Sequence, residues 1–195
     1  MKLTGYEDLR VQRTINSIYK AFEELICEKE YPKITVKELA ERAQINKKTF
    51  YRYYPTLDDL LHELQAQYAK KYIAEVKDFQ YPQDLEKSVA CFLEFSASQG
   101  EAYDKITVSG GESSYAGIRG QMINEVMTKT WGQSATFNLM SPWQKKVLLD
   151  FVESVGLNIY KAWVDDGKKE PLAQVIKQAQ ALVAGGVGQY LKIND

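Results

Sequence analysis

Residues 35–56 constrain the fold more than any other part of the chain, because they encode two short helices joined by a tight turn. Thr35 is followed three positions later by Glu38, a spacing typical of a capping box at the start of a helix. Asn46 is expected to cap a second helix over residues 47–53, which is rich in basic and aromatic side chains. A helix-turn-helix of this kind places the start of its second helix in the major groove of DNA.

A set of apolar, capping and aromatic residues recurs at fixed offsets through this segment and into the helix that follows it. Its members are Thr35, Val36, Leu39, Ala40, Ala43, Ile45, Asn46, Thr49, Phe50, Tyr51, Tyr53, Tyr54, Thr56, Leu60 and Leu61. The pattern resembles the N-terminal domain of the TetR family of bacterial one-component transcriptional repressors. The resemblance covers residues 10–61 in detail. Beyond them it rests only on the length of the chain and its all-helical pattern.

The resemblance implies an all-α fold in two parts. Residues 1–56 would form a three-helix head that contains the helix-turn-helix, and residues 57–195 would form a helical sensor and dimerisation domain. By the same resemblance, the chain would be a ligand-responsive repressor. It would bind a palindromic operator in double-stranded DNA as a homodimer, and no cofactor is expected.

The residues expected to contact DNA lie on or near the second short helix: Thr35, Lys37, Lys47, Lys48, Thr49, Tyr51, Arg52 and Tyr53. Long cations in its first turn reach guanine edges or phosphates. On the family pattern, Thr49 and Tyr51 occupy positions of direct DNA contact, and Tyr53 stands where the family usually has a histidine. The alternative is that the cations of this helix form only a solvated face.

Two positions depart from the family pattern. Gln44 replaces the glycine of the turn, and in a left-handed conformation it would be strained by roughly 1 kcal/mol relative to glycine. Leu57 replaces a lysine that commonly meets a phosphate, so one backbone contact per subunit would be lost. These departures keep an alternative open, namely a co-regulator of the same fold that acts through protein partners and binds little DNA itself.

The distribution of charge agrees with a DNA-binding head. The whole chain carries a formal net charge of -1. Residues 1–55 contain 11 Lys and Arg against 8 Asp and Glu, whereas the remaining residues contain 14 against 18. The basic excess therefore lies in the part that contains the helix-turn-helix, although it is modest.

Other classes of protein are disfavoured by what the sequence lacks. No signal peptide is expected, and no stretch approaches the ~18 apolar residues of a membrane span. Cys27 and Cys91 lie in apolar helical patterns, as expected of buried thiols in a reducing cytosol, so the protein is expected to be cytoplasmic. An enzyme or a metal site is disfavoured because the only histidine, His62, has no partner residue at a suitable spacing.

Apolar periodicity predicts further helices along the chain. Their expected ranges are 10–30, 57–79, 84–98 capped by Asp84, 101–109, 113–131, 142–166 capped by Ser141, and a last helix that Pro171 opens and Gly185 and Gly186 end. Residues 132–140 are polar and irregular, and we interpret them as a loop near a pocket.

The helix over residues 142–166 is apolar around most of its circumference, so it needs cover on two sides. The resemblance implies that the last two helices pair with their copies in a second subunit as a four-helix bundle. The expected interface residues are Val152, Val155, Ile159, Trp163, Val175, Ala179, Leu182 and Val183. The alternative is a central helix that is fully buried in a monomer.

Aromatic residues of the larger part are candidates for lining a pocket for a flat or apolar effector: Phe92, Phe95, Tyr103, Tyr115, Trp131, Phe137 and Phe151. The alternative for each of them is ordinary core packing. The sequence does not identify the effector. Its binding would favour a spacing of the two heads that no longer matches DNA.

Overall fold

The computed structural model describes residues 9–108, 131–132 and 134–192. Within these residues the secondary structure is helical, without a strand, and the predicted all-α fold class is confirmed. The helices are α1 (Leu9–Glu28), η1 (Tyr31–Lys33), α2 (Val36–Arg42), α3 (Lys47–Tyr53), α4 (Leu57–Val76), α5 (Leu85–Ser98), α6 (Glu101–Val108), α8 (Ala135–Leu139), α9 (Pro142–Asp165) and α10 (Leu172–Lys192).

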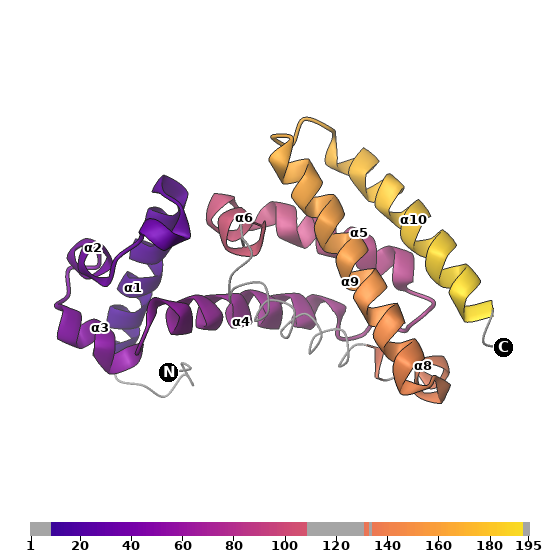
Figure 1. The fold of residues 1–195 in the computed structure, drawn as a ribbon, viewed down its shortest axis with the longest axis horizontal. Helices are drawn as coiled ribbons and strands as arrows, with labels where there is room; N and C mark the ends of the chain where they lie inside the picture. The colour runs from indigo at the N-terminus through magenta and orange to yellow at the C-terminus, as the bar shows by residue number, and fades with distance from the viewer. Residues whose placement is uncertain (1–8, 109–130, 133, 193–195) are drawn as a thin grey trace.

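The helices form a head and a body that are connected by α4 (Figure 1). Helices α1, α2 and α3 make the head at one end of the molecule. In the body, α9 and α10 lie side by side, and α5 packs against both. Helix α6 lies between the head and the body and contacts both α1 and α9.

One apolar cluster fills the head. The buried face of α1 includes Ile15, Ile18 and Phe22, which recur at the three- and four-residue spacing of an amphipathic helix. Phe50 of α3 packs into the same cluster, as do three leucines of α4 and Ile106 of α6. The head core is therefore completed by helices that follow the helix-turn-helix in the chain.

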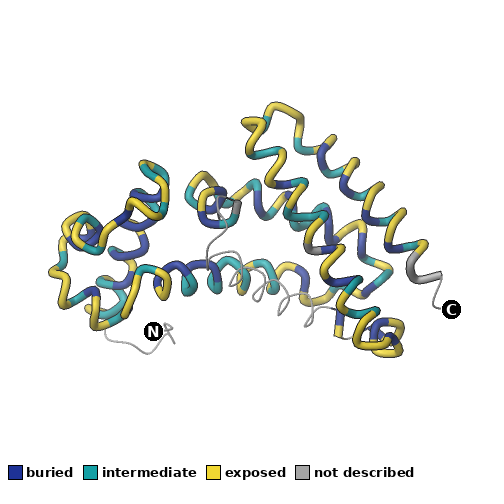
Figure 2. The backbone as a smooth tube through the Cα atoms, in the orientation of Figure 1, coloured by how far each residue is buried: buried dark blue, intermediate teal, exposed yellow. Residues whose placement is uncertain are grey.

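A second apolar cluster fills the body. Val175, Ala179, Val183 and Val187 recur every four residues along α10, and all four are buried in this cluster together with Val152 of α9. Buried and exposed residues alternate along α10 in Figure 2. One stripe of α10 is thus used within the chain, and the opposite stripe remains on its surface.

The segment 132–140 is not the irregular loop that we expected from its polar composition. Residues Ala135–Leu139 form the short helix α8, and Ser134 caps it by accepting a hydrogen bond from the Phe137 amide at 3.2 Å. The Phe137 side chain is buried in the body core. A helix of five residues spans little more than one turn, so its sequence cannot display a repeating apolar face.

The last helix also differs from its prediction, because α10 continues through Gly185 and Gly186 to Lys192. Glycine costs about 1 kcal/mol in a helix interior, but Val183 and Val187 on either side are both buried in the body core. A Cβ atom at position 186 would lie 2.8 Å from the Phe151 ring. Gly186 therefore provides the space in which this ring packs on α10.

The boundaries of the other described helices agree with the predictions to within a few residues. One predicted helix cap, at Asp84, does not form. Asp84 precedes α5 as expected, but its carboxylate accepts a hydrogen bond from the Gln80 amide at 2.8 Å and makes no cap bond to the helix. The predicted helix over residues 113–131 lies outside the described residues except for its end at Trp131. None of the described helices is long and apolar enough to cross a membrane.

Candidate nucleic-acid interface

Side-chain caps fix the start of both helices of the helix-turn-helix. Thr35 Oγ1 accepts a hydrogen bond from the Glu38 amide at 3.3 Å, and a Glu38 carboxylate oxygen accepts one from the Thr35 amide at 3.2 Å. Asn46 Oδ1 accepts a hydrogen bond from the Thr49 amide at 2.8 Å. The predicted capping box of α2 and the predicted N-cap of α3 are both confirmed.

The turn between the two helices has the predicted left-handed residue. Gln44 has a φ angle of 55° and an exposed side chain. The Ile45 amide donates a hydrogen bond to the Ala40 carbonyl at 2.9 Å, and the Ile45 side chain packs half-buried against the head core. Gln44 thus holds a conformation that favours glycine, and the turn keeps its tight geometry.

Helix α3 divides cleanly into an inner and an outer face. Its inner face is anchored by Phe50, which is 0% exposed. Its outer face exposes Lys47, Lys48, Tyr51 and Arg52 to solvent. No acidic residue lies in the helix.

The cations of the head fall into two groups. Arg42 of α2 donates to both carboxylate oxygens of Glu28 at 2.7 and 2.9 Å, and so holds α2 to α1. By contrast, among the described residues no carboxylate forms an ion pair with Lys47, Lys48 or Arg52. The basic charge of α3 therefore has no ion-pair partner among the described residues, whereas Arg42 of α2 is paired with Glu28.

The two threonine hydroxyls among the predicted contacts are already engaged. Thr35 Oγ1 lies 3.0 Å from Glu38 Oε2, and Thr49 Oγ1 donates to Asn46 Oδ1 at 3.1 Å. Each hydroxyl proton therefore serves a helix cap, and a bond to a phosphate would need the hydroxyl to rotate away from it. Lys37 is exposed on α2 and makes only a 4.0 Å contact with Glu41.

The two predicted tyrosine contacts differ in how far they reach the surface. Tyr51 is 53% exposed, and its ring rests edge-on against Phe50 with the ring centroids 5.6 Å apart. Tyr53 is half-buried and packs against the head core. The Arg52 guanidinium lies 6.0 Å from the centroid of the Tyr53 ring. Tyr51 therefore offers the larger surface for contact.

The start of α4 carries negative charge where the family pattern has a lysine. Leu57 is half-buried against the head core. Asp59 forms a capping box with Thr56, and Asp58 accepts a hydrogen bond from the Tyr31 hydroxyl. None of these three α4 side chains supplies a cation for a phosphate.

A buried hydrogen-bond network holds the end of α3, and our sequence analysis missed it. Tyr54, which follows α3 and is 1% exposed, donates its hydroxyl proton to the Tyr19 hydroxyl of α1 at 3.3 Å. Tyr19 donates to Glu63 Oε1 at 2.6 Å and accepts a hydrogen bond from Gln67 Nε2 at 2.7 Å. Burial, reinforced by the bond to Glu63, raises the pKa of Tyr19 to about 12. The network joins residues 35 to 48 positions apart, and no local pattern reveals such pairs.

Helix α6 connects the head to the far end of α9. Its Ile106 is completely buried in the head core. Two residues earlier, Asp104 accepts a hydrogen bond from the Tyr160 hydroxyl at 2.5 Å and forms an ion pair with Lys168 at 2.7 Å. Burial, reinforced by Asp104, raises the pKa of Tyr160. Tyr103 of α6 is buried in the body core, so this short helix contributes to both cores.

The predicted pocket residues lie in three places within the described chain. Phe92, Phe95 and Tyr103 form one aromatic group with Tyr72 and Tyr160, with ring centroids 5.6 to 6.3 Å apart. Trp131 packs against Tyr81 and against Phe137 in a second group. Phe151 is 39% exposed on α9, and Tyr115 lies outside the described residues. A cavity of about 180 Å³ between α1 and α4 is lined by none of them.

The predicted interface residues divide into two sets. Val152, Val175, Ala179 and Val183 are buried in the body core of the single chain, so they are not available at its surface. Val155, Ile159 and Trp163 are half-buried at the edge of that core, and Leu182 is 60% exposed. Periodicity identified an apolar helix face but could not tell packing within the chain from packing between chains.

The described residues contain no group of three or more His, Cys, Asp and Glu side chains that could hold a metal ion. Cys27 and Cys91 are free and half-buried. Burial raises the pKa of both thiols, which disfavours the thiolate. His62 is half-buried on α4, and its Nε2 atom has no hydrogen-bond partner among the described residues.

Comparison with known families supports the assignment of the head. Residues 18–64 match the family model described as bacterial regulatory proteins, tetR family. A search of curated proteins gave no significant match to the sequence. The matched segment begins within α1 and contains α2, α3 and the first turns of α4.

Comparison with solved structures extends the likeness to the whole fold. The fatty acid degradation regulator FadR from Bacillus halodurans is 16% identical, with a TM-score of 0.66 over 88% of this chain and 98% of that one. FadR from Bacillus subtilis, solved in complex with stearoyl-CoA, is 15% identical, with a TM-score of 0.62 over 87% and 97% of the two chains. A tetR-family regulator from Streptomyces coelicolor is 12% identical, with a TM-score of 0.62 over 93% and 87%. At these identities the likeness establishes the fold.

Proposed function

We propose that this chain, which belongs to the TetR family of bacterial regulatory proteins, represses transcription by binding a palindromic operator as a homodimer. In this proposal a small-molecule effector releases the protein from DNA in the cytoplasm. The observation that carries it is the outer face of α3. There Lys47, Lys48 and Arg52 are exposed, and within the described residues none of them has an ion-pair partner.

The proposed mode of reading follows from the geometry of α3. Lys47 and Lys48 lie in its first turn, which in a docked helix-turn-helix faces the base edges and the flanking phosphates. Arg52 and Tyr51 would contact the phosphate backbone on either side. Each neutralised phosphate contributes about 0.9 to the slope of log affinity against log salt, so binding should weaken steeply as salt rises.

A dimer is proposed because one recognition helix reads only a few base pairs. Two heads on a palindrome need a spacing of about 34–36 Å, or one helical turn of DNA. The proposed interface is the surface of α9 and α10 that lies outside the body core. It contains Leu182 and Phe151, and it continues from Phe151 along α9 in steps of four residues through Val155, Ile159 and Trp163. A second copy of this surface would cover the exposed apolar side chains.

Release by an effector is proposed to act through α4 and α6, because these helices belong to the head core and also reach the body. The Bacillus subtilis FadR complex with stearoyl-CoA provides a precedent for a ligand bound within this fold. In this chain the aromatic group around Phe92, Phe95 and Tyr103 is the proposed neighbourhood of the effector. An effector that binds better to one head spacing would shift the population away from the DNA-binding form.

The proposal is tested by titrating the full chain against fluorescent duplexes from its own promoter region. Sequence-specific binding that two α3 substitutions, Lys47→Ala and Lys48→Ala, weaken by at least tenfold would support it. Lys70→Ala on α4 removes an exposed lysine outside the head and serves as the control. Equal affinity for promoter and scrambled duplexes would contradict it.

The alternative is a co-regulator of the same fold that acts through protein partners. It is favoured by the start of α4, where Asp58 and Asp59 stand in a turn that has no cation. A folded dimer that selects no duplex from a library of random sequences, with no change on α3 substitution, would favour this alternative over the repressor.

A further inference from the structure

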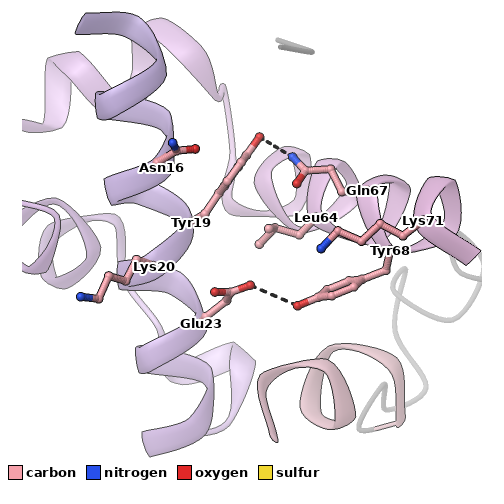
Figure 3. Close-up of a pocket in the computed structure, with 8 residues that line it drawn as sticks. All are labelled: Asn16, Tyr19, Lys20, Glu23, Leu64, Gln67, Tyr68 and Lys71. Carbon is pink, nitrogen blue, oxygen red and sulfur yellow. Dashed lines mark hydrogen bonds between the residues drawn. The ribbon is translucent and has the colours of Figure 1, made fainter. Parts of the chain in front are cut away.

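A crevice between α1 and α4 forms a cavity of about 180 Å³ at the joint of head and body. Figure 3 shows Tyr19 and Glu23 of α1 on one side and Tyr68 and Lys71 of α4 on the other. Leu64, which is almost completely buried, forms part of the wall between them. The cavity is smaller than the roughly 300–1,000 Å³ pockets that take drug-sized ligands.

Hydrogen bonds that cross from one helix to the other brace the crevice. The Tyr68 hydroxyl donates to Glu23 Oε1 at 3.1 Å, and Gln67 Nε2 donates to the Tyr19 hydroxyl at 2.7 Å. Both bonds join α1 to α4 and hold the two walls of the crevice to each other. The crevice is thus present without a ligand.

The crevice contains the ammonium of Lys71, an exposed lysine of α4. The Lys71 ammonium lies 5.3 Å from the centroid of the Tyr68 ring and points into the space between the helices (Figure 3). No carboxylate in the described part of the chain forms an ion pair with Lys71. Glu23 is bonded to Tyr68, and the ammonium of Lys20 points away from α4 (Figure 3). Lys71 is therefore the cation of the lining whose ammonium enters the crevice.

The size and the charge together define the chemistry of a fitting molecule. A carboxylate would pair with the single Lys71 ammonium, whereas a phosphate dianion carries a second charge that no other ammonium of the lining faces. The rings of Tyr19 and Tyr68 and the side chain of Leu64 provide apolar surface next to the ammonium. We propose that this crevice is a binding site for a small monocarboxylate with a short apolar body, and that Lys71 binds the carboxylate.

The site can be tested on the full chain without DNA, so the outcome does not depend on whether the protein represses transcription. Benzoate and benzamide have the same shape and differ in charge, and they serve as the two probes. Methyl-labelled leucine NMR reports where each probe binds. Benzoate should shift the Leu64 methyl signals saturably and leave those of Leu93 in the body core unchanged, and benzamide should bind about tenfold more weakly or worse.

Neighbouring lysines of α4 provide matched variants. Lys71→Gln should weaken benzoate binding about tenfold or more, because the charge-assisted bond is lost. Lys71→Arg keeps the charge and should retain binding. Lys70→Gln removes the same charge from an exposed position that does not line the crevice, and should have no effect. Thermal unfolding of each variant checks that the fold is intact.

Three results would overturn the site. The first is equal binding of benzoate and benzamide, and the second is equal loss of binding in Lys71→Gln and Lys70→Gln. The third is a benzoate response at Leu93 without one at Leu64, which would move the carboxylate site into the body.

Discussion

The hydroxyl of Tyr54 lies 3.3 Å from the hydroxyl of Tyr19, so the residue that follows α3 is bonded directly to α1. Tyr19 is bonded in turn to Glu63 and Gln67 of α4. A change in the angle between α4 and α1 must therefore strain bonds that also hold the end of α3. This network gives the proposed effector response a physical route to the DNA-binding surface.

The network should make stability fall at high pH. The pKa of Tyr19 is raised to about 12 in the folded chain, against about 10 when unfolded, so the folded state favours the protonated hydroxyl. Its stabilising effect is complete below pH 10 and is lost as the pH rises from 10 to 12. One such group lowers the free energy of unfolding by up to about 1.4 kcal/mol per pH unit in that range. Urea unfolding of the Tyr19→Phe variant should show a shallower alkaline slope, and an unchanged slope would argue against the network.

The recognition surface should tolerate substitution without loss of fold. Lys48→Ala and Tyr51→Ala should each weaken operator binding by about 1–3 kcal/mol for the dimer, because each removes an exposed contact. Lys48→Ala should leave the melting temperature within a few degrees, since Lys48 makes no ion pair with a described residue. Fluorescence anisotropy and thermal unfolding measure the two quantities. Unchanged affinity in both variants would remove α3 as the reading helix.

Substitution by glycine should change the free energy of unfolding in opposite directions at two residues that have a positive φ. Gln44→Gly should raise the free energy of unfolding by up to about 1 kcal/mol, because glycine adopts a φ of 55° without strain. Lys168 has a φ of 56°, but its ammonium pairs with the buried Asp104, so Lys168→Gly should lower the free energy of unfolding by about 1–3 kcal/mol. Chemical denaturation of both variants measures the contrast, and the same sign for both would contradict it.

Substitutions at two adjacent residues of α10 test the proposed interface and the body core separately. Leu182 is 60% exposed and Val183 is 1% exposed. Leu182→Asp should leave the chain folded and shift its mass in light scattering from twice 22.3 kDa to 22.3 kDa. Val183→Asp should instead unfold the body, because it places a charge in an apolar core. A folded dimer of Leu182→Asp would place the interface elsewhere.

Local signals predicted the helix-turn-helix well because its helix caps depend on residues only a few positions apart. The capping pair of Thr35 with Glu38 was legible from its spacing, and so was the Asn46 cap of α3. The left-handed turn at Gln44 was expected only from the family resemblance, in which glycine occupies this position. Leu57 was also recognised as a departure, although its half-buried position became evident only in the structure.

Longer-range features could not be predicted in the same way. Glycine is common at helix ends, so Gly185 and Gly186 were interpreted as the end of the last helix. In the structure the Phe151 ring packs against Gly186, and α10 continues to Lys192. The aromatic residues of the body fitted a pocket and a core equally well by pattern. The crevice was missed because Glu23 and Lys71 are 48 positions apart, and each alone looks like an ordinary surface charge.

The buried position of Ile106 has a consequence for how the molecule can be divided. The core of the head contains Ile106 of α6 and also Leu60, Leu61 and Leu64 of α4, all of which follow residue 56. A fragment that stops at residue 56 would leave Phe22 and its neighbours uncovered, at a cost of about 25 cal/mol for each Å² of apolar surface exposed. We expect such a fragment not to fold alone. The DNA-binding unit that a protein engineer could transplant extends at least through α4, and it needs a substitute for α6.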